Sequence, residues 1–173
     1  MTLQNGAVHG GEVRLWTDTA YLDASTGKIA CFDSKAFEGL FWPFAGALSL
    51  VGPTTAAYDI PAAIGAAYPA SVDELLDVTS KALLAYAGKG GFGRVLIGAW
   101  EDGPRLFVIA TDGAGLVAPF EPAELDFYCS SGNPDLAGLV NVLVRQANVG
   151  DRNRFRIRSG FCIVRGLDLA PRY

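Results

Sequence analysis

The most constraining feature of the sequence is a hairpin signal in the middle of the chain. Residues 94–100 and 104–110 are apolar at nearly every position, and the turn pair Asp102 and Gly103 lies between them. Asp-Gly pairs favour the tight turns of antiparallel hairpins. Strands that lack an alternation of apolar and polar residues are buried on both faces. This hairpin is therefore expected at the centre of a sheet that is covered by other layers.

The elements predicted around the hairpin do not alternate between strand and helix. Strands are predicted over residues 12–17, 28–32, 44–50, 125–131 and 154–166. Two consecutive helices are predicted before the hairpin, one over about 54–67 and one that begins at a capping box formed by Ser71 and Glu74. A third helix is predicted to begin at Asn133. Paired helices and antiparallel strands indicate an α+β chain with two stacked sheets and helices outside them.

The composition favours an apolar domain that associates with copies of itself. A chain of 173 residues is expected to form a single domain over 1–173, with about 70% of its unfolded surface buried. Hydrophobic residues make up 50% of the chain and charged residues 18%, against about 25% charged residues in a typical globular protein. The surplus of apolar surface favours a homo-oligomer. The net charge of −4 gives no reason to expect nucleic acid as a partner.

Two further patterns bear on location. No secretory leader is recognised, so a cytoplasmic location is expected. The stretch 39–58 carries no charge and has the length of a membrane span, but Pro43 and Pro53 would break such a helix. A buried strand, a turn and the start of a helix explain this stretch better than a membrane segment.

No metal or cofactor site is expected. His9 is the only histidine, and it is interpreted as a surface or turn residue. The cysteines have no metal-ligand spacing and lie in apolar, strand-like runs, so they are expected to be buried, reduced thiols. They are Cys31, Cys129 and Cys162.

The order of elements resembles that of the N-terminal-nucleophile hydrolases, and specifically proteasome β subunits and the related bacterial ATP-dependent peptidase. The resemblance is strongest over residues 81–113, where a helix ends in a glycine-rich turn and the hairpin follows. Residues 127–133 resemble the Ser-Gly strand end of that family. The resemblance implies a four-layer αββα sandwich, here with a shortened C-terminal helical layer. It also implies a ring or other homo-oligomer, a peptide or protein substrate, and an unfoldase ATPase as a possible partner.

The same resemblance implies four catalytic residues. Thr2 matches the nucleophile of the family if Met1 is removed, and Asp18 lies sixteen residues later, as the family's aspartate does. Lys35 matches the family's lysine when one inserted residue is allowed in the turn at 23–27. Ser131 matches the serine beside the N-terminal amine. Gly52 is the candidate for the glycine that contacts the substrate.

These residue types suit amide hydrolysis. A threonine hydroxyl becomes a nucleophile when a base accepts its proton, and a free α-amine has a pKa near 7.7 to 8.0. A neighbouring lysine disfavours a second positive charge on that amine, and an aspartate holds the lysine in place. Each residue also has a structural interpretation: Thr2 as an ordinary small second residue, Asp18 as a turn residue, Lys35 as a solvated strand end and Ser131 as the cap of a turn before the helix.

Three features depart from the family pattern. Asn5 and Gly6 form a turn signal where the family has a continuous first strand. The small glycine pair after the fourth strand is replaced by residues 49–52, and one helix instead of two follows the Ser-Gly element. These departures favour an alternative hypothesis, in which the chain is a catalytically inactive homologue that serves as an oligomeric assembly or binding module.

A basic ridge is expected on the last strand. Arg154, Arg156 and Arg158 alternate along one face of that strand. An edge strand protected by charge explains the ridge better than an anion or nucleic-acid site, because no stacking aromatic residues are interleaved on that face.

Overall fold

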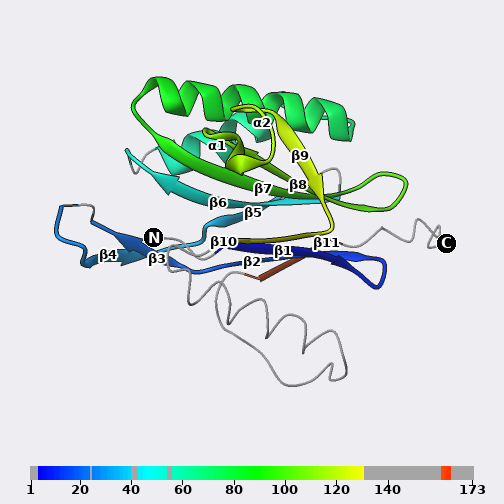
Figure 1. Ribbon diagram of the computed structural model, residues 1–173, viewed down its shortest axis with the longest axis horizontal. Helices are drawn as coiled ribbons and strands as arrows, with labels where there is room; N and C mark the ends of the chain where they lie inside the picture. The colour runs from blue at the N-terminus through cyan, green and yellow to red at the C-terminus, as the bar shows by residue number, and fades with distance from the viewer. Residues whose placement is uncertain (1–3, 24, 40–42, 54–55, 131–160, 165–173) are drawn as a thin grey trace, which may run out of the picture.

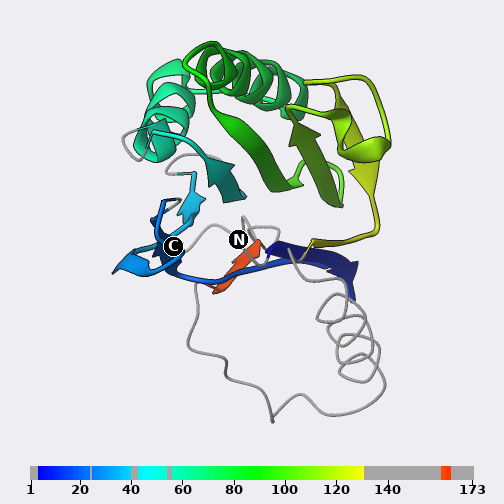
Figure 2. The same cartoon turned by 60° about the vertical axis from the view of Figure 1, so that its left-hand side comes forward.

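The computed structural model describes residues 4–23, 25–39, 43–53, 56–130 and 161–164 (Figure 1). In these ranges a pair of helices lies on one sheet, and that sheet lies on a second one (Figures 1 and 2). Pairing within both sheets is antiparallel. The predicted α+β architecture of stacked sheets with helices outside is therefore confirmed.

The upper sheet contains the predicted hairpin at its centre. Its order is β5-β6-β7-β8-β9. The strands are β5 (Ala36–Glu38), β6 (Phe44–Val51), β7 (Phe92–Trp100), β8 (Pro104–Ala110) and β9 (Pro122–Leu125). Val95 and Ile97 of β7 pack in the cluster under the helices, whereas Leu96 packs in the cluster between the sheets. The apolar run in β7 is thus explained by burial on both faces.

The helices cover the outer face of this sheet. They are α1 (Ala56–Ala67) and α2 (Val72–Gly88). As predicted, α2 is capped by Ser71, whose hydroxyl accepts a hydrogen bond from the Glu74 N–H at 3.2 Å. Neither of these helices is both long and apolar enough to cross a membrane.

The lower sheet has the order β10-β1-β2-β11. Its strands are β1 (Gln4–His9), β2 (Glu12–Thr17), β10 (Phe127–Ser130) and β11 (Phe161–Val164). The strand predicted over 125–131 is divided between the two sheets. In the structure β9 ends at Leu125 in the upper sheet, and β10 begins at Phe127 in the lower one. His9 is exposed at the end of β1, as predicted.

The turn predicted at Asn5 and Gly6 is wrong, since β1 runs through both residues. A Cβ atom at position 6 would lie 2.8 Å from the Leu106 Cδ1 atom of the upper sheet. Gly6 is therefore explained by the close approach of two sheets, and not by a turn. The turn after β1 is formed instead by Gly10 and Gly11, which both have positive φ.

A separate two-stranded sheet projects from the stacked sheets (Figure 1). It consists of β3 (Ala20–Leu22) and β4 (Ile29–Phe32). Cys31 in β4 is exposed and Cys129 is partly exposed. The prediction of a buried thiol is wrong for Cys31, because a sheet of two strands offers it no covering layer.

The fourth predicted layer falls on residues outside the described ranges. This applies to the helix from Asn133 and to the ridge of Arg154, Arg156 and Arg158.

Candidate active site

The structure brings Asp18 and Lys35 together. Asp18 follows the last residue of β2, and Lys35 precedes the first residue of β5. The Lys35 ammonium donates a hydrogen bond to Asp18 Oδ1. The Lys35 side chain is 4% exposed and the Asp18 side chain 28%. Lys35 is therefore a buried cation with a carboxylate partner, and its interpretation as a solvated strand end is wrong.

Two further groups contact the Lys35 ammonium. It donates a hydrogen bond to the Ala20 carbonyl oxygen at 2.5 Å. The ring of Tyr21 lies beneath it, with 4.9 Å between Nζ and the ring centroid. An aromatic face attracts a cation, most strongly where water is excluded. The ammonium is thus held by a carboxylate, a carbonyl and a ring, which fix its position.

Backbone pairing positions the two charged residues. The Leu48 N–H on β6 donates to the Lys35 carbonyl oxygen at 2.8 Å. The Thr17 hydroxyl donates to the Asp18 carbonyl oxygen at 3.1 Å. Lys35 is therefore attached to the upper sheet through its backbone, and to the end of the lower sheet through its side chain.

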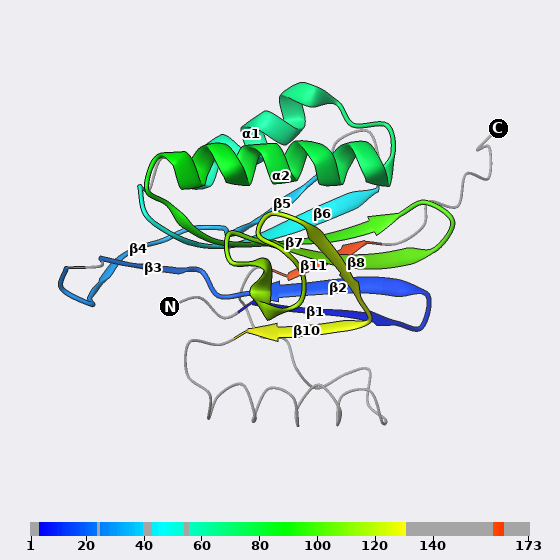
Figure 3. The same ribbon diagram turned by 45° about the horizontal axis from the view of Figure 1, so that its top comes forward.

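Three strand ends of the lower sheet meet beside this pair. Gln4, the first described residue of β1, pairs with Thr17 on one side and with Ser130 on the other. Thus β1 begins at the same end of the sheet at which β2 and β10 terminate (Figure 3). Thr2 and Ser131 lie outside the described residues.

Gly52 follows the end of β6. It lies four residues after Leu48, which corresponds to about 13 Å of extended chain. Its φ is +143°, and a Cβ atom there would lie 2.7 Å from the Tyr86 hydroxyl oxygen and 2.9 Å from the Gly91 Cα atom. Close packing against α2 and the following turn thus gives a structural reason for glycine at position 52.

A group of polar residues near the pair was missed by the sequence analysis. The Tyr58 hydroxyl of α1 donates a hydrogen bond to Asp33 Oδ2. This bond and the Ser34 N–H hold the pKa of Asp33 below its usual value. Burial, followed by the nearby Tyr58 and Asp33, raises the pKa of Tyr21 to about 12. Tyr21 therefore remains a neutral phenol around neutral pH, and its ring serves as a contact for Lys35.

The sequence carried only a weak signal for these residues. Tyr21 stands three positions after Asp18, and Asp33 two positions before Lys35, but Tyr58 is more than twenty residues away.

Burial raises the pKa of the Cys129 thiol, which makes it a poor nucleophile at neutral pH. Within the described ranges, no three His, Cys, Asp or Glu side chains are grouped as a metal site would require.

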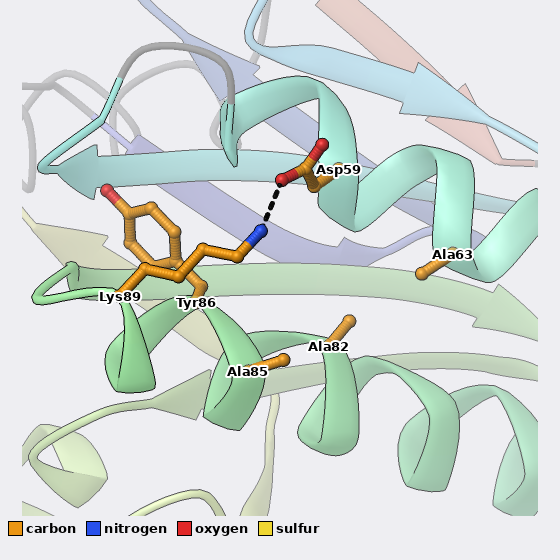
Figure 4. A pocket seen from close by; sticks show the side chains of 6 residues that line it. All are labelled: Asp59, Ala63, Ala82, Ala85, Tyr86 and Lys89. Atoms are coloured by element: carbon orange, nitrogen blue, oxygen red, sulfur yellow. Dashed lines mark hydrogen bonds and ion pairs between the residues drawn. The ribbon is translucent and has the colours of Figure 1, made fainter.

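A depression of about 250 Å³ lies elsewhere, between α1 and α2 (Figure 4). Lys89 and Asp59 form an ion pair of 2.9 Å at one end of it, next to the ring of Tyr86. Both charged side chains are more than half exposed, so the pair contributes little to stability. The depression is on the helical face and does not include Asp18 or Lys35.

Comparison with known proteins supports the fold. No family model and no curated protein matches this sequence. A solved structure that matches is described as an Anbu (Gly-1) mutant from Hyphomicrobium sp. strain MC1, with 15% sequence identity and a TM-score of 0.57. The match covers 78% of this chain but only 61% of the solved structure's chain, so this chain spans less than two thirds of the length of that protein. The chain therefore shares the α+β fold of that solved structure, with stacked antiparallel sheets and a pair of helices outside them.

Proposed function

We propose that the chain is a proteasome-like N-terminal threonine hydrolase that cleaves peptide amide bonds. The observation that carries this proposal is the buried Lys35 ammonium, paired with Asp18 at the end of the lower sheet where β1 begins. Thr2 precedes Gln4 by two residues in the sequence. In the proposal, Thr2 is the first residue of the mature chain and its hydroxyl attacks the scissile carbonyl.

The α-amine of Thr2 is the general base in this mechanism. It accepts the hydroxyl proton as the carbon–oxygen bond forms, and later delivers the proton to the leaving amine. The nearby Lys35 ammonium disfavours a second positive charge, so the pKa of the α-amine falls below its ordinary value near 7.7 to 8.0. A larger fraction of the amine is then neutral near pH 7. Asp18 holds Lys35 in place through their ion pair, and has no direct role in the attack.

Ser131 and Gly52 have supporting roles in the proposal. The hydroxyl of Ser131 orients the α-amine; Ser130, the residue before it, pairs with Gln4 at the same edge. The backbone N–H of Gly52 is the candidate donor to the substrate, and its positive φ is a conformation that favours glycine.

Self-association is part of the same proposal. The described surface exposes many large apolar side chains that a partner copy would cover. They are Leu22, Ile29, Val51, Tyr58, Tyr68, Leu84, Phe92, Leu116, Val117 and Phe127. We propose a single-domain subunit in a ring or other homo-oligomer in the cytoplasm, which receives peptides or unfolded protein from an ATPase.

Peptide hydrolysis by protein with a defined first residue tests the proposal. The chain is released from a cleavable leader so that Thr2 is its first residue, and intact mass verifies this. Hydrolysis of a panel of fluorogenic peptide amides is compared between this protein, Thr2→Ala and a form that retains Met1. Activity in the first sample alone supports the proposal. Equal, measurable rates in the three samples would remove Thr2 from any catalytic role, and no hydrolysis in any of them would favour the inactive assembly module.

A further inference from the structure

Gln4 is a fully buried polar residue between the two sheets. Its side chain is 0% exposed, and its amide N–H donates to the Ala47 carbonyl oxygen at 2.5 Å. This bond joins β1 of the lower sheet to β6 of the upper sheet, across 43 positions of sequence. The amide oxygen, Oε1, has no hydrogen-bond partner among the described residues.

The hydrogen bond from Gln4 to Ala47 completes a closed series of contacts that includes Lys35. Ala47 is followed by Leu48, whose N–H donates to the Lys35 carbonyl oxygen. The Lys35 side chain binds Asp18, and Asp18 follows Thr17, which pairs with Gln4. The start of β1 is thus attached to Lys35 along two routes, one through β2 and one through β6.

A glutamine at this position lowers the stability of the fold relative to an apolar residue of similar size. The space between the sheets is lined by apolar side chains, including Val13, Leu15 and Ala45. A buried amide that lacks one of its partners costs free energy, whereas an unbranched apolar side chain of similar size would fill the space without that cost. A buried polar group without a partner among the described residues needs an explanation, and for Gln4 the bond to Ala47 across the two sheets offers one.

We propose that Gln4 is a positioning residue, which holds the start of β1 at a fixed distance from the Lys35 ammonium. This inference rests on the proposed function, in which Thr2 is the nucleophile two residues earlier. Thr2 lies two positions before Gln4 in the sequence, so the Gln4–Ala47 bond holds the end of β1 that is nearest to Thr2 in the chain. The effect of Lys35 on the α-amine depends on the distance between the two groups, and the Gln4–Ala47 bond sets that distance.

The variant Gln4→Met tests the role, in protein whose first residue is Thr2. Methionine keeps the length of the side chain and removes both polar atoms. The matched control is Asn5→Leu, because Asn5 is also buried (3% exposed) and its Oδ1 has no partner among the described residues. Asn5 lies on the opposite face of β1. Gln4→Leu serves as a second substitution of similar volume.

Three quantities are measured for each protein. They are kcat and KM on a fluorogenic peptide amide, the melting temperature, and the pKa of the Thr2 α-amine. The pKa is obtained from the pH dependence of α-amine acetylation by acetic anhydride, read by peptide mass spectrometry. The α-amine pKa does not depend on turnover, so it reports on positioning even if no peptide is cleaved.

We expect Gln4→Met to lower kcat about 100-fold, because a misplacement of about 1 Å has that effect. KM is expected to stay within about twofold, since substrate contacts are unchanged. The melting temperature is expected to stay within about 4 °C, because the loss of one hydrogen bond is offset by removal of an amide oxygen that has no partner among the described residues. The α-amine pKa, lowered in the parent protein, should return to about 7.7 to 8.0. Asn5→Leu should change neither kcat nor this pKa.

Other outcomes separate this inference from the proposed function. A parent protein with a lowered α-amine pKa but no turnover refutes the peptidase, while a return of that pKa in Gln4→Met still supports the role of Gln4. An α-amine pKa that is the same in the parent and in Gln4→Met overturns the inference, with or without turnover. Loss of folding in both Gln4→Met and Gln4→Leu also overturns it, because Gln4 would then be a structural residue.

Discussion

Removal of Asp18 is predicted to destabilise the folded chain more than removal of Lys35. The two side chains form one ion pair, but water reaches them unequally: Lys35 is almost fully buried, whereas Asp18 is partly exposed. Asp18→Ala leaves a buried ammonium without its carboxylate partner. Lys35→Met leaves a carboxylate that water can still solvate, and fills the buried space with an apolar side chain of similar length.

The magnitudes follow from the cost of unpaired charge. Breaking a buried pair by removal of one partner costs about 3 to 5 kcal/mol when the remaining charge is buried. We expect about 3 kcal/mol for Asp18→Ala, because the Ala20 carbonyl and the Tyr21 ring still contact the ammonium. For Lys35→Met we expect about 1 kcal/mol, since a lost charged hydrogen bond is partly replaced by hydration of Asp18. The double variant should resemble Lys35→Met.

Urea unfolding at pH 7 measures these differences. With a slope of about 2 kcal/mol per molar urea, Asp18→Ala should lower the midpoint by about 1.5 M and Lys35→Met by about 0.5 M. Lys81→Ala is the control, because its ion pair with Asp77 lies on the exposed surface of α2 and contributes about 0 to 0.5 kcal/mol. Equal losses for the two single variants, or a larger loss for Lys35→Met, would refute the assigned burial of the lysine.

Three further predictions concern the fold and the phenol beside Lys35. Gly6→Ala should lower the free energy of unfolding by about 1 to 3 kcal/mol, because the new methyl group meets the buried Leu106 side chain. Gly103→Ala has open space around it and should lower the free energy of unfolding by less than about 0.5 kcal/mol. Urea unfolding measures both values. Ser71→Ala should lower stability by about 1 kcal/mol through loss of the N-cap of α2, and an unchanged thermal midpoint would contradict this. Because the pKa of Tyr21 is raised to about 12 in the folded chain, its contribution to stability is complete below pH 10 and is lost as the pH rises toward about 12. Tyr21→Phe should weaken this alkaline loss and remove one ultraviolet phenolate titration near pH 12, and a Tyr21 titration at pH 10 would contradict the assignment.

Much of the fold was predictable, because its signals are local. The cap of Ser71 on Glu74 involves residues three positions apart, and the turn at Asp102 and Gly103 joins strands that are neighbours in sequence. The apolar run in β7 required burial on both faces, and the two layers that cover it were found. Such patterns depend on a few adjacent residues, so they can be read without knowledge of distant parts of the chain.

The errors occurred where local and distant requirements compete. Asn5 and Gly6 carry a turn signal, but the glycine serves the approach of Leu106, which lies 100 residues away in the sequence. Cys31 is in an apolar strand-like run, but its strand belongs to the projecting two-stranded sheet, where no layer covers it. Composition and periodicity cannot separate these cases, because both depend on which segments meet in space.

The candidate site shows the same division. Resemblance to a known family selected Asp18 and Lys35 from the sequence, and the structure joins them in an ion pair. The catalytic roles of both residues, like those of Thr2, Ser131 and Gly52, are proposals. Only the tertiary structure placed the Tyr21 ring beneath the ammonium and connected Gln4 to Ala47.

The sequence by itself determined the central hairpin, the two helices and the stacked-sheet architecture, since hydrophobic pattern, capping and turn chemistry act over short distances. The burial of Lys35 and the link between β1 and β6 were decided by the tertiary structure. Both arise from contacts between residues that are far apart in the sequence, and these contacts exist only once the two sheets have packed together.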